Sequence, residues 1–283
     1  MTAPSDLIQV AVIGTGGQGI VNIKSLLQQA DVRIAAVADP TEQADYSRFY
    51  YGGVAGRLPA LKLINEHYKK QGIPYGGCHE YVDYRILLEK EKNIDALLIA
   101  TPDHAHGVVT MAALKLKKHV YTEKPLCRTL SETWKIVEAA RNAGVSTQMG
   151  NYGHSGEGLR NFCEWIADGA IGAIREVHSW ANFPPMNDLK EYPKETPEVP
   201  KGMDWDLWLG PSPARPYHPA YAPVTWRAWH EFGVGMLGDF ACHHMDPAVQ
   251  ALKLGYPTSI EATTHQEGKN TYPYASLVHY HFP

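Results

Sequence analysis

Ile8-Gln-Val-Ala-Val-Ile-Gly14-Thr-Gly16-Gly-Gln-Gly19 is the stretch of sequence that decides the fold. It joins a short apolar segment, typical of a buried strand, directly to the pattern Gly-x-Gly-x-x-Gly. Apolar residues then recur at the spacing of one helix face, at positions 20, 21, 23, 26 and 27. A strand, a glycine-rich turn and a helix in this order predict the start of a dinucleotide-binding α/β fold.

Each glycine of the pattern has a predicted role. Gly14 permits a tight turn, Gly16 lets the backbone approach a pyrophosphate without an intervening Cβ, and Gly19 lets helix and strand pack closely. The N–H groups at the start of the helix, together with the positive end of the helix dipole, are expected to bind the phosphates.

A second apolar strand, residues 33–39, ends at Asp39, which lies 25 positions after Gly14. We expect its carboxylate to hold the adenosine ribose hydroxyls. The same charge would repel a 2′-phosphate, so NAD is favoured over NADP. The alternative is a glycine-rich turn that binds no nucleotide, with Asp39 as an ordinary strand-end residue.

Composition and charge exclude several classes of protein. The chain has 283 residues, 44% hydrophobic and 20% charged, which is typical of a globular protein long enough for two domains. The net charge is −4 and the basic residues do not cluster, so we expect no nucleic-acid partner. Every apolar run is shorter than the about 18–20 residues that cross a bilayer, so we expect no membrane span. The four cysteines have no paired spacing, which favours reduced thiols.

The polar N-terminus shows none of the features of an export signal. It has no basic region, no apolar core and no cleavage site. This predicts a cytoplasmic protein, or a periplasmic one if a signal was removed before this sequence begins.

The first half of the chain alternates predicted strands and helices. Strands are expected at 95–102, 119–125 and 145–150, and helices at 105–116 and 129–143. Thr129 and Glu132 match a capping box, and Gly144 is a helix stop. This alternation predicts right-handed crossovers and a doubly wound parallel sheet, so we assign residues 1–150 to a Rossmann domain.

Two parts of the chain depart from this alternation. Residues 46–77 begin with a Tyr- and Gly-rich stretch and contain a predicted helix at 59–70; we interpret them as a lengthened connection on the rim of the Rossmann domain, with no function assigned. From residue 151 on, the patterns predict a helix at 158–167, a strand at 175–182, an ordered Pro- and Trp-rich loop at 184–223, a helix at 244–254 and strands at 259–266 and 276–282. They indicate a second, substrate-binding α+β domain over residues 151–283, with a mostly antiparallel, open-faced sheet.

Three segments carry candidate chemistry. Thr101-Pro102-Asp103-His104 and Glu123-Lys124-Pro125 each end a predicted sheet strand, and ligands bind at the carboxyl ends of such strands. In the segment 235–246, Asp239 and His243 lie four positions apart and share one face if the segment is helical. An acid and an imidazole placed in this way can meet one substrate hydroxyl.

The alternative for the last segment is a zinc site formed by Cys242, His243, His244 and Asp246. Adjacent residues on a helix point in different directions, and no second cluster has metal-ligand spacing. We therefore expect no metal. A further alternative is that His243 is a core histidine and that its neighbour His244 is the functional member of the pair.

These motifs occur in the order found in a known family. The chain resembles the Gfo/Idh/MocA oxidoreductases, which include glucose–fructose oxidoreductase and inositol 2-dehydrogenase, from residue 8 to about residue 255. The resemblance rests on the glycine loop, on Thr101–His104, Glu123–Pro125, Trp205–Pro211, Trp226-Arg227 and Gly238–Asp246. Within the family, the chain looks like the bacterial branch that acts on sugars and glycosides.

The resemblance implies a dehydrogenase that transfers a hydride between a secondary hydroxyl of a sugar, glycoside or cyclitol and NAD. Its small-molecule partner would be a carbohydrate or polyol. One alternative is an NAD-dependent glycosidase that acts through a transient keto-sugar. Another is a non-catalytic nucleotide-binding partner subunit.

The resemblance also implies roles for individual residues. Lys124 would polarise the substrate hydroxyl, and His243 would be the general base. Asp239 would bind a neighbouring hydroxyl and fix the imidazole, while Trp226 and Arg227 would bind the sugar. The implied cofactor-binding residues are Gly14, Gly16, Gly19, Asp39, Thr101, Pro102, His104, Glu123 and Asn151.

Structural alternatives exist for these residues as well. Lys124 is then a solvated strand-end lysine, Asp239 a helix N-cap, and Trp226 and Arg227 supply core packing and a salt bridge. Family members usually continue beyond a strand such as 276–282, so we expect the second domain to be incomplete. An unpaired sheet edge there favours a homodimer or homotetramer.

Overall fold

A six-stranded parallel sheet forms the first half of the computed structural model, which describes residues 7–47, 52–73, 75–182 and 188–283. The strand order is β5-β2-β1-β6-β7-β8, and each pairing is parallel. The strands are β1 (Ile8–Ile13), β2 (Val32–Ala38), β5 (His79–Tyr81), β6 (Ala96–Ile99), β7 (His119–Glu123) and β8 (Thr147–Gly150). This confirms the predicted doubly wound sheet, whose order reverses between β1 and β6 and so creates a ligand-binding crevice there.

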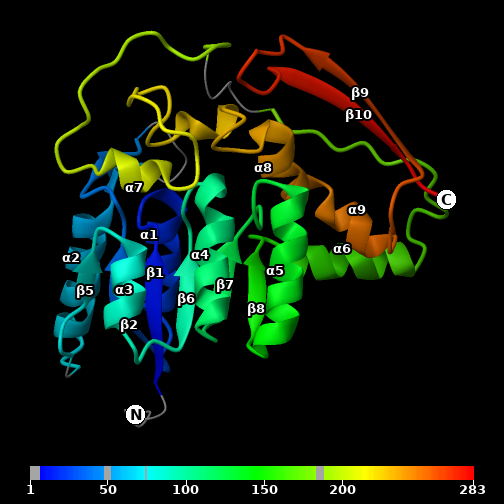
Figure 1. Ribbon diagram of the computed structural model, residues 1–283. Coiled ribbons are helices and arrows are strands. Elements are labelled where there is room, and N and C mark those ends of the chain that lie inside the picture. The colour runs from blue at the N-terminus through cyan, green and yellow to red at the C-terminus, as the bar shows by residue number, and fades with distance from the viewer. Residues whose placement is uncertain (1–6, 48–51, 74, 183–187) are drawn as a thin grey trace.

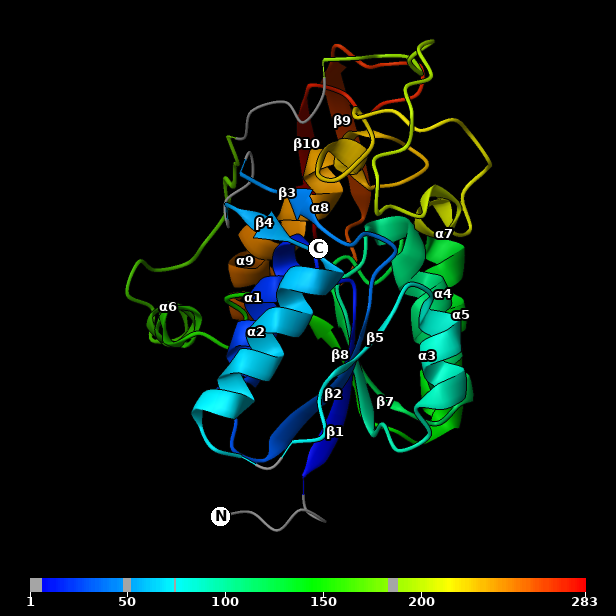
Figure 2. The same ribbon diagram turned by 90° about the vertical axis from the view of Figure 1, so that its left-hand side faces the viewer.

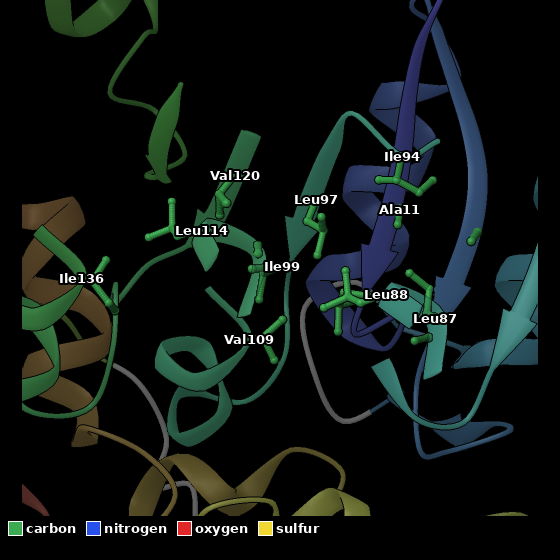
Figure 3. Close-up of a cluster of buried hydrophobic side chains, with 14 of the residues drawn as sticks. Ala11, Leu87, Leu88, Ile94, Leu97, Ile99, Val109, Leu114, Val120 and Ile136 are labelled. Carbon is green, nitrogen blue, oxygen red and sulfur yellow. The ribbon is translucent and has the colours of Figure 1, made fainter. Parts of the chain in front are cut away.

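Helices cover both faces of the sheet, as its apolar strands require. Figure 2 shows α1 (Gly17–Leu26) and α2 (Arg57–Lys70) on one face, and α3 (Tyr84–Lys90), α4 (Asp103–Lys115) and α5 (Leu130–Ala143) on the other. The core beneath α3, α4 and α5 contains Leu87, Leu97, Ile99, Val109 and Ile136 (Figure 3). The predicted capping box is present at Thr129 and Glu132, and Gly144 ends α5 in the left-handed conformation.

Within the insert at residues 46–77, helix α2 belongs to the core of the Rossmann domain, so the interpretation as a rim connection is wrong for this helix. The helix buries Ala60, Ile64 and Tyr68 against the sheet, and the Ile34 N–H donates to the Tyr68 hydroxyl at 3.1 Å. The apolar spacing of this segment is that of a crossover helix between β2 and β5, which the parallel sheet requires. Tyr50 and Tyr51 lie outside the described residues.

The second half has the predicted α+β character. It contains α6 (Glu157–Ala167), α7 (Trp205–Leu209), the 3₁₀ helix η2 (Thr225–Ala228), α8 (Gly235–His244), α9 (Asp246–Ala251) and the antiparallel strands β9 (Ser259–His265) and β10 (Ala275–His281). The strand expected at 175–182 does not form: these residues are mostly exposed and pair with no strand of the described chain. A strand exists only where a partner completes its hydrogen bonds, which an alternating pattern alone does not supply.

The Trp-rich loop is described over residues 188–223, and its residues 184–187 lie outside the described part. Trp205, Trp208, Tyr221, Trp229 and Phe232 form a separate buried aromatic cluster. Figure 1 shows α7 and α8 over the carboxyl ends of the sheet strands. None of the helices in the described ranges is both long enough and apolar enough to cross a membrane.

Hydrogen bonds fasten the second half to the first. His104, in the first turn of α4, donates its backbone N–H to the Phe232 carbonyl at 3.1 Å. Its ring nitrogens lie 2.9 Å from the Trp208 carbonyl oxygen and 3.3 Å from that of Phe232. The Arg128 guanidinium donates to the His230 carbonyl at 2.8 Å. These contacts hold the aromatic cluster across the crevice of the sheet.

Candidate functional site

A cavity of about 960 Å³ lies between the strand ends of the sheet and the second half of the chain. The glycine loop and Asp39 line it, and so do Lys124, Asp239 and His243. Its volume falls within the range of cofactor and small-molecule sites. The cavity therefore links the predicted nucleotide loop to the predicted reacting groups.

The glycine loop has the tight geometry that its sequence predicts. Gly14 has a φ of +84°, and a Cβ built there would lie 2.6 Å from the Ala100 carbonyl oxygen. A Cβ on Gly19 would lie 2.0 Å from the Gly14 carbonyl oxygen, so only glycine lets α1 pack this closely. Helix α1 begins at Gly17 without a side-chain cap, which leaves N–H groups of its first turn for a phosphate.

The Asp39 carboxylate holds the glycine loop in shape. Its Oδ2 accepts hydrogen bonds from the Thr15 N–H at 2.7 Å and the Thr15 hydroxyl at 3.2 Å, and its Oδ1 accepts from the Thr41 N–H at 2.9 Å. Burial raises the pKa of Asp39, while these hydrogen bonds oppose the rise. Asp39 also lines the cavity, and its contact with a ribose stays a prediction.

Two cations from different elements hold the Asp239 carboxylate. Lys124, directly after β7, donates from Nζ to Asp239 Oδ1 and, at 3.0 Å, to the Asp239 carbonyl. Arg227 of η2 donates from Nε to Asp239 Oδ2 at 3.0 Å. Burial opposes the ionisation of Asp239, but the charges of Arg227 and Lys124 outweigh it and hold the pKa of this carboxyl below its usual value.

His243 lies one helical turn after Asp239 on α8. Burial, and next the charge of Lys124, lower the pKa of His243, while a hydrogen bond to the Tyr152 backbone opposes this. A lowered pKa keeps the imidazole neutral at neutral pH, which is the form that accepts a proton. The hydrogen bonds and ion pairs of the Asp239 carboxylate go to Lys124 and Arg227 and not to this imidazole.

The positions of Trp226 and Arg227 agree with both of their predicted roles, which are core packing with a salt bridge and sugar binding. Arg227 forms the salt bridge to Asp239, and its guanidinium lies 4.0 Å from the centre of the Trp226 ring. Both residues also line the cavity. Contact with a sugar therefore stays a prediction for this pair.

The remaining predicted cofactor residues divide into two groups. Thr101, Pro102 and Glu123 line the cavity, whereas His104 and Asn151 do not. His104 is buried between backbone carbonyls, and burial lowers its pKa to about 4. The Asn151 amide donates to the Cys242 carbonyl at 2.8 Å. The cofactor-binding role of His104 and Asn151 therefore stays a prediction; the Asn151 Oδ1 is buried and has no hydrogen-bond partner.

Buried polar atoms without partners are consistent with a ligand that completes the site. Thr101 Oγ1 and Asp103 Oδ2 belong to cavity-lining residues and have no hydrogen-bond partner. Such atoms are rare in folded proteins unless a ligand or water satisfies them. Together with the glycine loop, they fit a dinucleotide that extends along the cavity. Within the described ranges, no three His, Cys, Asp or Glu side chains are arranged to hold a metal ion.

Asp103 also lines the cavity, although the sequence pattern Thr101–His104 predicts no separate role for it. It is the first residue of α4, only 2% of its surface is exposed, and the Val234 N–H donates to its carboxyl. Burial, and next the negative charge of Asp239, raise its pKa to about 8. Only its burial distinguishes it from an ordinary helix-start aspartate.

We expect Asp103 to make the folded state less stable as the pH rises. Its folded pKa of about 8 exceeds the ordinary value of 3.8, so its contribution is complete below the latter and is lost as the pH rises through 8. Asp103→Asn cannot ionise, so it should lose less unfolding free energy than the parent chain between about pH 6 and about pH 9. Urea unfolding measures this, with the exposed Asp168→Asn as the control. Equal losses in parent and variant would contradict the prediction.

Relatives of known name match parts of the chain. A 1,5-anhydro-D-fructose reductase of Ensifer adhaerens is 33% identical over 120 residues, which are 41% of this chain and 35% of that protein. A glycosyl hydrolase family 109 protein of Shewanella sp. (strain W3-18-1) is 28% identical over 193 residues, 67% of this chain and 37% of that protein. The chain thus spans little more than a third of the length of these two relatives.

Solved structures and family models cover more of the chain. The WlbA dehydrogenase of Bordetella pertussis, solved with NADH and UDP-GlcNAcA, shares the fold with a TM-score of 0.64 at 17% identity, covering 97% of this chain and 67% of that one. Residues 8–151 match the Gfo/Idh/MocA oxidoreductase family model with an NAD-binding Rossmann fold. Residues 188–282 match the C-terminal α/β domain model of the same family. The chain therefore belongs to the Gfo/Idh/MocA family of NAD-binding oxidoreductases.

Proposed function

We propose that the chain is an NAD-dependent dehydrogenase that oxidises a secondary hydroxyl of a sugar, glycoside or cyclitol. One observation carries the proposal: Lys124 from the first half, and Asp239 and His243 from the second, line the same cavity as the glycine loop. The similarity to a reductase of an anhydro sugar supports the substrate class. A carbohydrate or polyol is then the small-molecule partner.

When bound, NAD supplies the nicotinamide ring that accepts the hydride. The Lys124 ammonium donates a hydrogen bond to the substrate hydroxyl oxygen and so stabilises the negative charge that develops there. His243, as the neutral imidazole, takes the hydroxyl proton as general base. Asp239 keeps Lys124 and Arg227 at the cavity wall through its two ion pairs.

The test is the formation of reduced cofactor when the purified chain is mixed with NAD and a panel of sugars, glycosides and inositols. We expect reduction with at least one polyol and a strong loss of rate in His243→Ala. Tight NAD binding without reduction by any member of the panel would overturn the proposed function.

A second candidate is an NAD-dependent glycosidase that oxidises its substrate transiently and then cleaves it. The similarity to a glycosyl hydrolase family 109 protein over 67% of this chain favours it. The same panel separates the two candidates. Release of sugar without net accumulation of reduced cofactor supports the glycosidase.

We also propose that the chain assembles as a homodimer or homotetramer. The β9–β10 sheet supports this, because each of its two faces carries an exposed apolar side chain, Ile260 at 58% and Leu277 at 60%. Exposed apolar side chains on a sheet favour association with another surface. The cytoplasmic location stays a prediction from the sequence.

A further inference from the structure

The hairpin before α2 places a tyrosine against the glycine loop. Tyr46 directly follows β3 (Ala44–Asp45), which pairs with β4 (Val54–Ala55), and its N–H donates to the Gly53 carbonyl at 2.8 Å. The Gly56 N–H donates to the Thr15 carbonyl of the glycine loop at 3.2 Å. The backbone that carries Tyr46 is therefore tied both to its own hairpin and to the loop.

The Tyr46 hydroxyl occupies the space that Gly16 leaves open. A Cβ built on Gly16 would lie 2.0 Å from Tyr46 Oη and 2.7 Å from Cζ. Gly16 has an ordinary negative φ of −71°, so its backbone conformation does not require glycine. The contact with Tyr46 thus favours a glycine at this position, because any larger residue would collide with the Tyr46 hydroxyl.

A phosphate beside the glycine loop would find neutral donors. The loop 14–19 contains no Lys or Arg. Tyr46 lines the cavity together with Gly16, Gly17 and Gln18, which form the first turn of α1 and the residue before it. A phenol hydroxyl is a hydrogen-bond donor, and its bonds to charged acceptors are stronger than those to neutral ones.

We propose that the Tyr46 hydroxyl binds the pyrophosphate of the dinucleotide, donating a hydrogen bond to a phosphate oxygen beside the first turn of α1. The proposal rests on the NAD binding in the proposed function. The insert at residues 46–77 then has two roles: its helix α2 packs in the core, and its Tyr46 binds the phosphates. The hairpin brings a donor to the phosphates that the glycine loop itself does not carry.

Tyr46→Phe tests the proposal, because it removes the hydroxyl and keeps the ring. Affinities are measured by calorimetry for NAD, for ADP-ribose, which keeps the pyrophosphate, and for adenosine, which lacks it. We expect NAD and ADP-ribose to bind roughly tenfold or more weakly to the variant. Adenosine should bind within about twofold of its affinity for the parent chain, because it makes no phosphate hydrogen bond.

Tyr256→Phe, at an exposed tyrosine far from the hairpin in the sequence, is the matched control and should leave all three affinities unchanged. Unfolding temperatures without ligand show whether Tyr46→Phe keeps the fold. Unchanged or increased affinity for NAD overturns the proposal, and so does an equal loss for adenosine. A parent chain that binds NAD but oxidises no polyol overturns the proposed function alone, whereas one that binds no NAD overturns both.

Discussion

Asp239→Ala should lower the free energy of unfolding by about 3–5 kcal/mol, because it leaves two poorly exposed cations without their counter-ion. The side chains of Lys124 and Arg227 are 17% and 13% exposed, and that of Asp239 is 5% exposed. A buried lysine can lose its proton, but arginine keeps its charge. Arg227 must therefore keep its charge without the Asp239 carboxylate, or move away from the Trp226 ring. Urea unfolding at neutral pH measures the loss.

A double mutant separates the charge from the packing of Asp239. Asp239→Ala/Arg227→Met also removes one of the two cations that face the Asp239 carboxylate, so we expect the double variant to be more stable than Asp239→Ala alone by about 1 kcal/mol or more. The exposed Asp168→Ala is the control. A loss below about 1 kcal/mol in Asp239→Ala would contradict the prediction, because it would mean that water screens both pairs.

The pH dependence of this effect has a defined sign. The pKa of Asp239 is lowered in the folded chain, so its contribution to stability is present above its unfolded pKa and is lost as the pH falls through the folded value. Parent chain and Asp239→Ala should therefore become similar in stability in strong acid. Asp103 has the opposite effect: its raised pKa makes the folded chain less stable as the pH rises toward about 8.

The parts of the fold that the sequence predicts well are those whose constraints are local. The tight turn at Gly14 and the contact of Gly19 with the Gly14 carbonyl arise within six residues, so the glycine pattern carries them. The same holds for the capping box of Thr129 and Glu132. Because these constraints act on neighbours in sequence, they are readable before any tertiary contact is known.

Long-range contacts explain what the sequence does not reveal. Residues 175–182 alternate like a strand, yet a strand needs a partner from elsewhere in the chain. Tyr46 reaches Gly16 across 30 positions, through a hairpin whose strands have two residues each. The raised pKa of Asp103 depends on burial that its position at a strand end does not indicate.

In the candidate site as well, sequence motifs identify the residues, whereas long-range contacts determine which of them pair. The family resemblance singles out Lys124, Asp239 and His243, and these residues line one cavity. The resemblance pairs Asp239 with the imidazole, whereas the structure pairs it with Lys124, 115 positions away in sequence, and with Arg227. The partners of Asp239 are set by the packing of α8 against η2 and by the position of Lys124 directly after β7, and no local pattern encodes that.

Lys124→Met should lower kcat/KM by about 10²–10⁴-fold for any polyol that the parent chain oxidises. Methionine keeps the length and the packing of the side chain but removes the ammonium that donates to the substrate hydroxyl. Asp239 keeps Arg227 as its counter-ion, so the fold retains one of its two ion pairs here. Initial rates of NAD reduction, at several substrate concentrations, separate the loss in kcat from any change in KM.

Lys115→Met is the control, because Lys115 is an exposed lysine of the last turn of α4 in the same domain. NAD affinity should stay within about twofold in both variants, since the proposed contact of Lys124 is with the substrate. A decrease of less than about tenfold in kcat/KM would show that the amine does not act on the reacting hydroxyl. A loss confined to NAD affinity would instead assign Lys124 to cofactor binding, and the ion pair with Asp239 would then serve to position the cofactor and not the substrate.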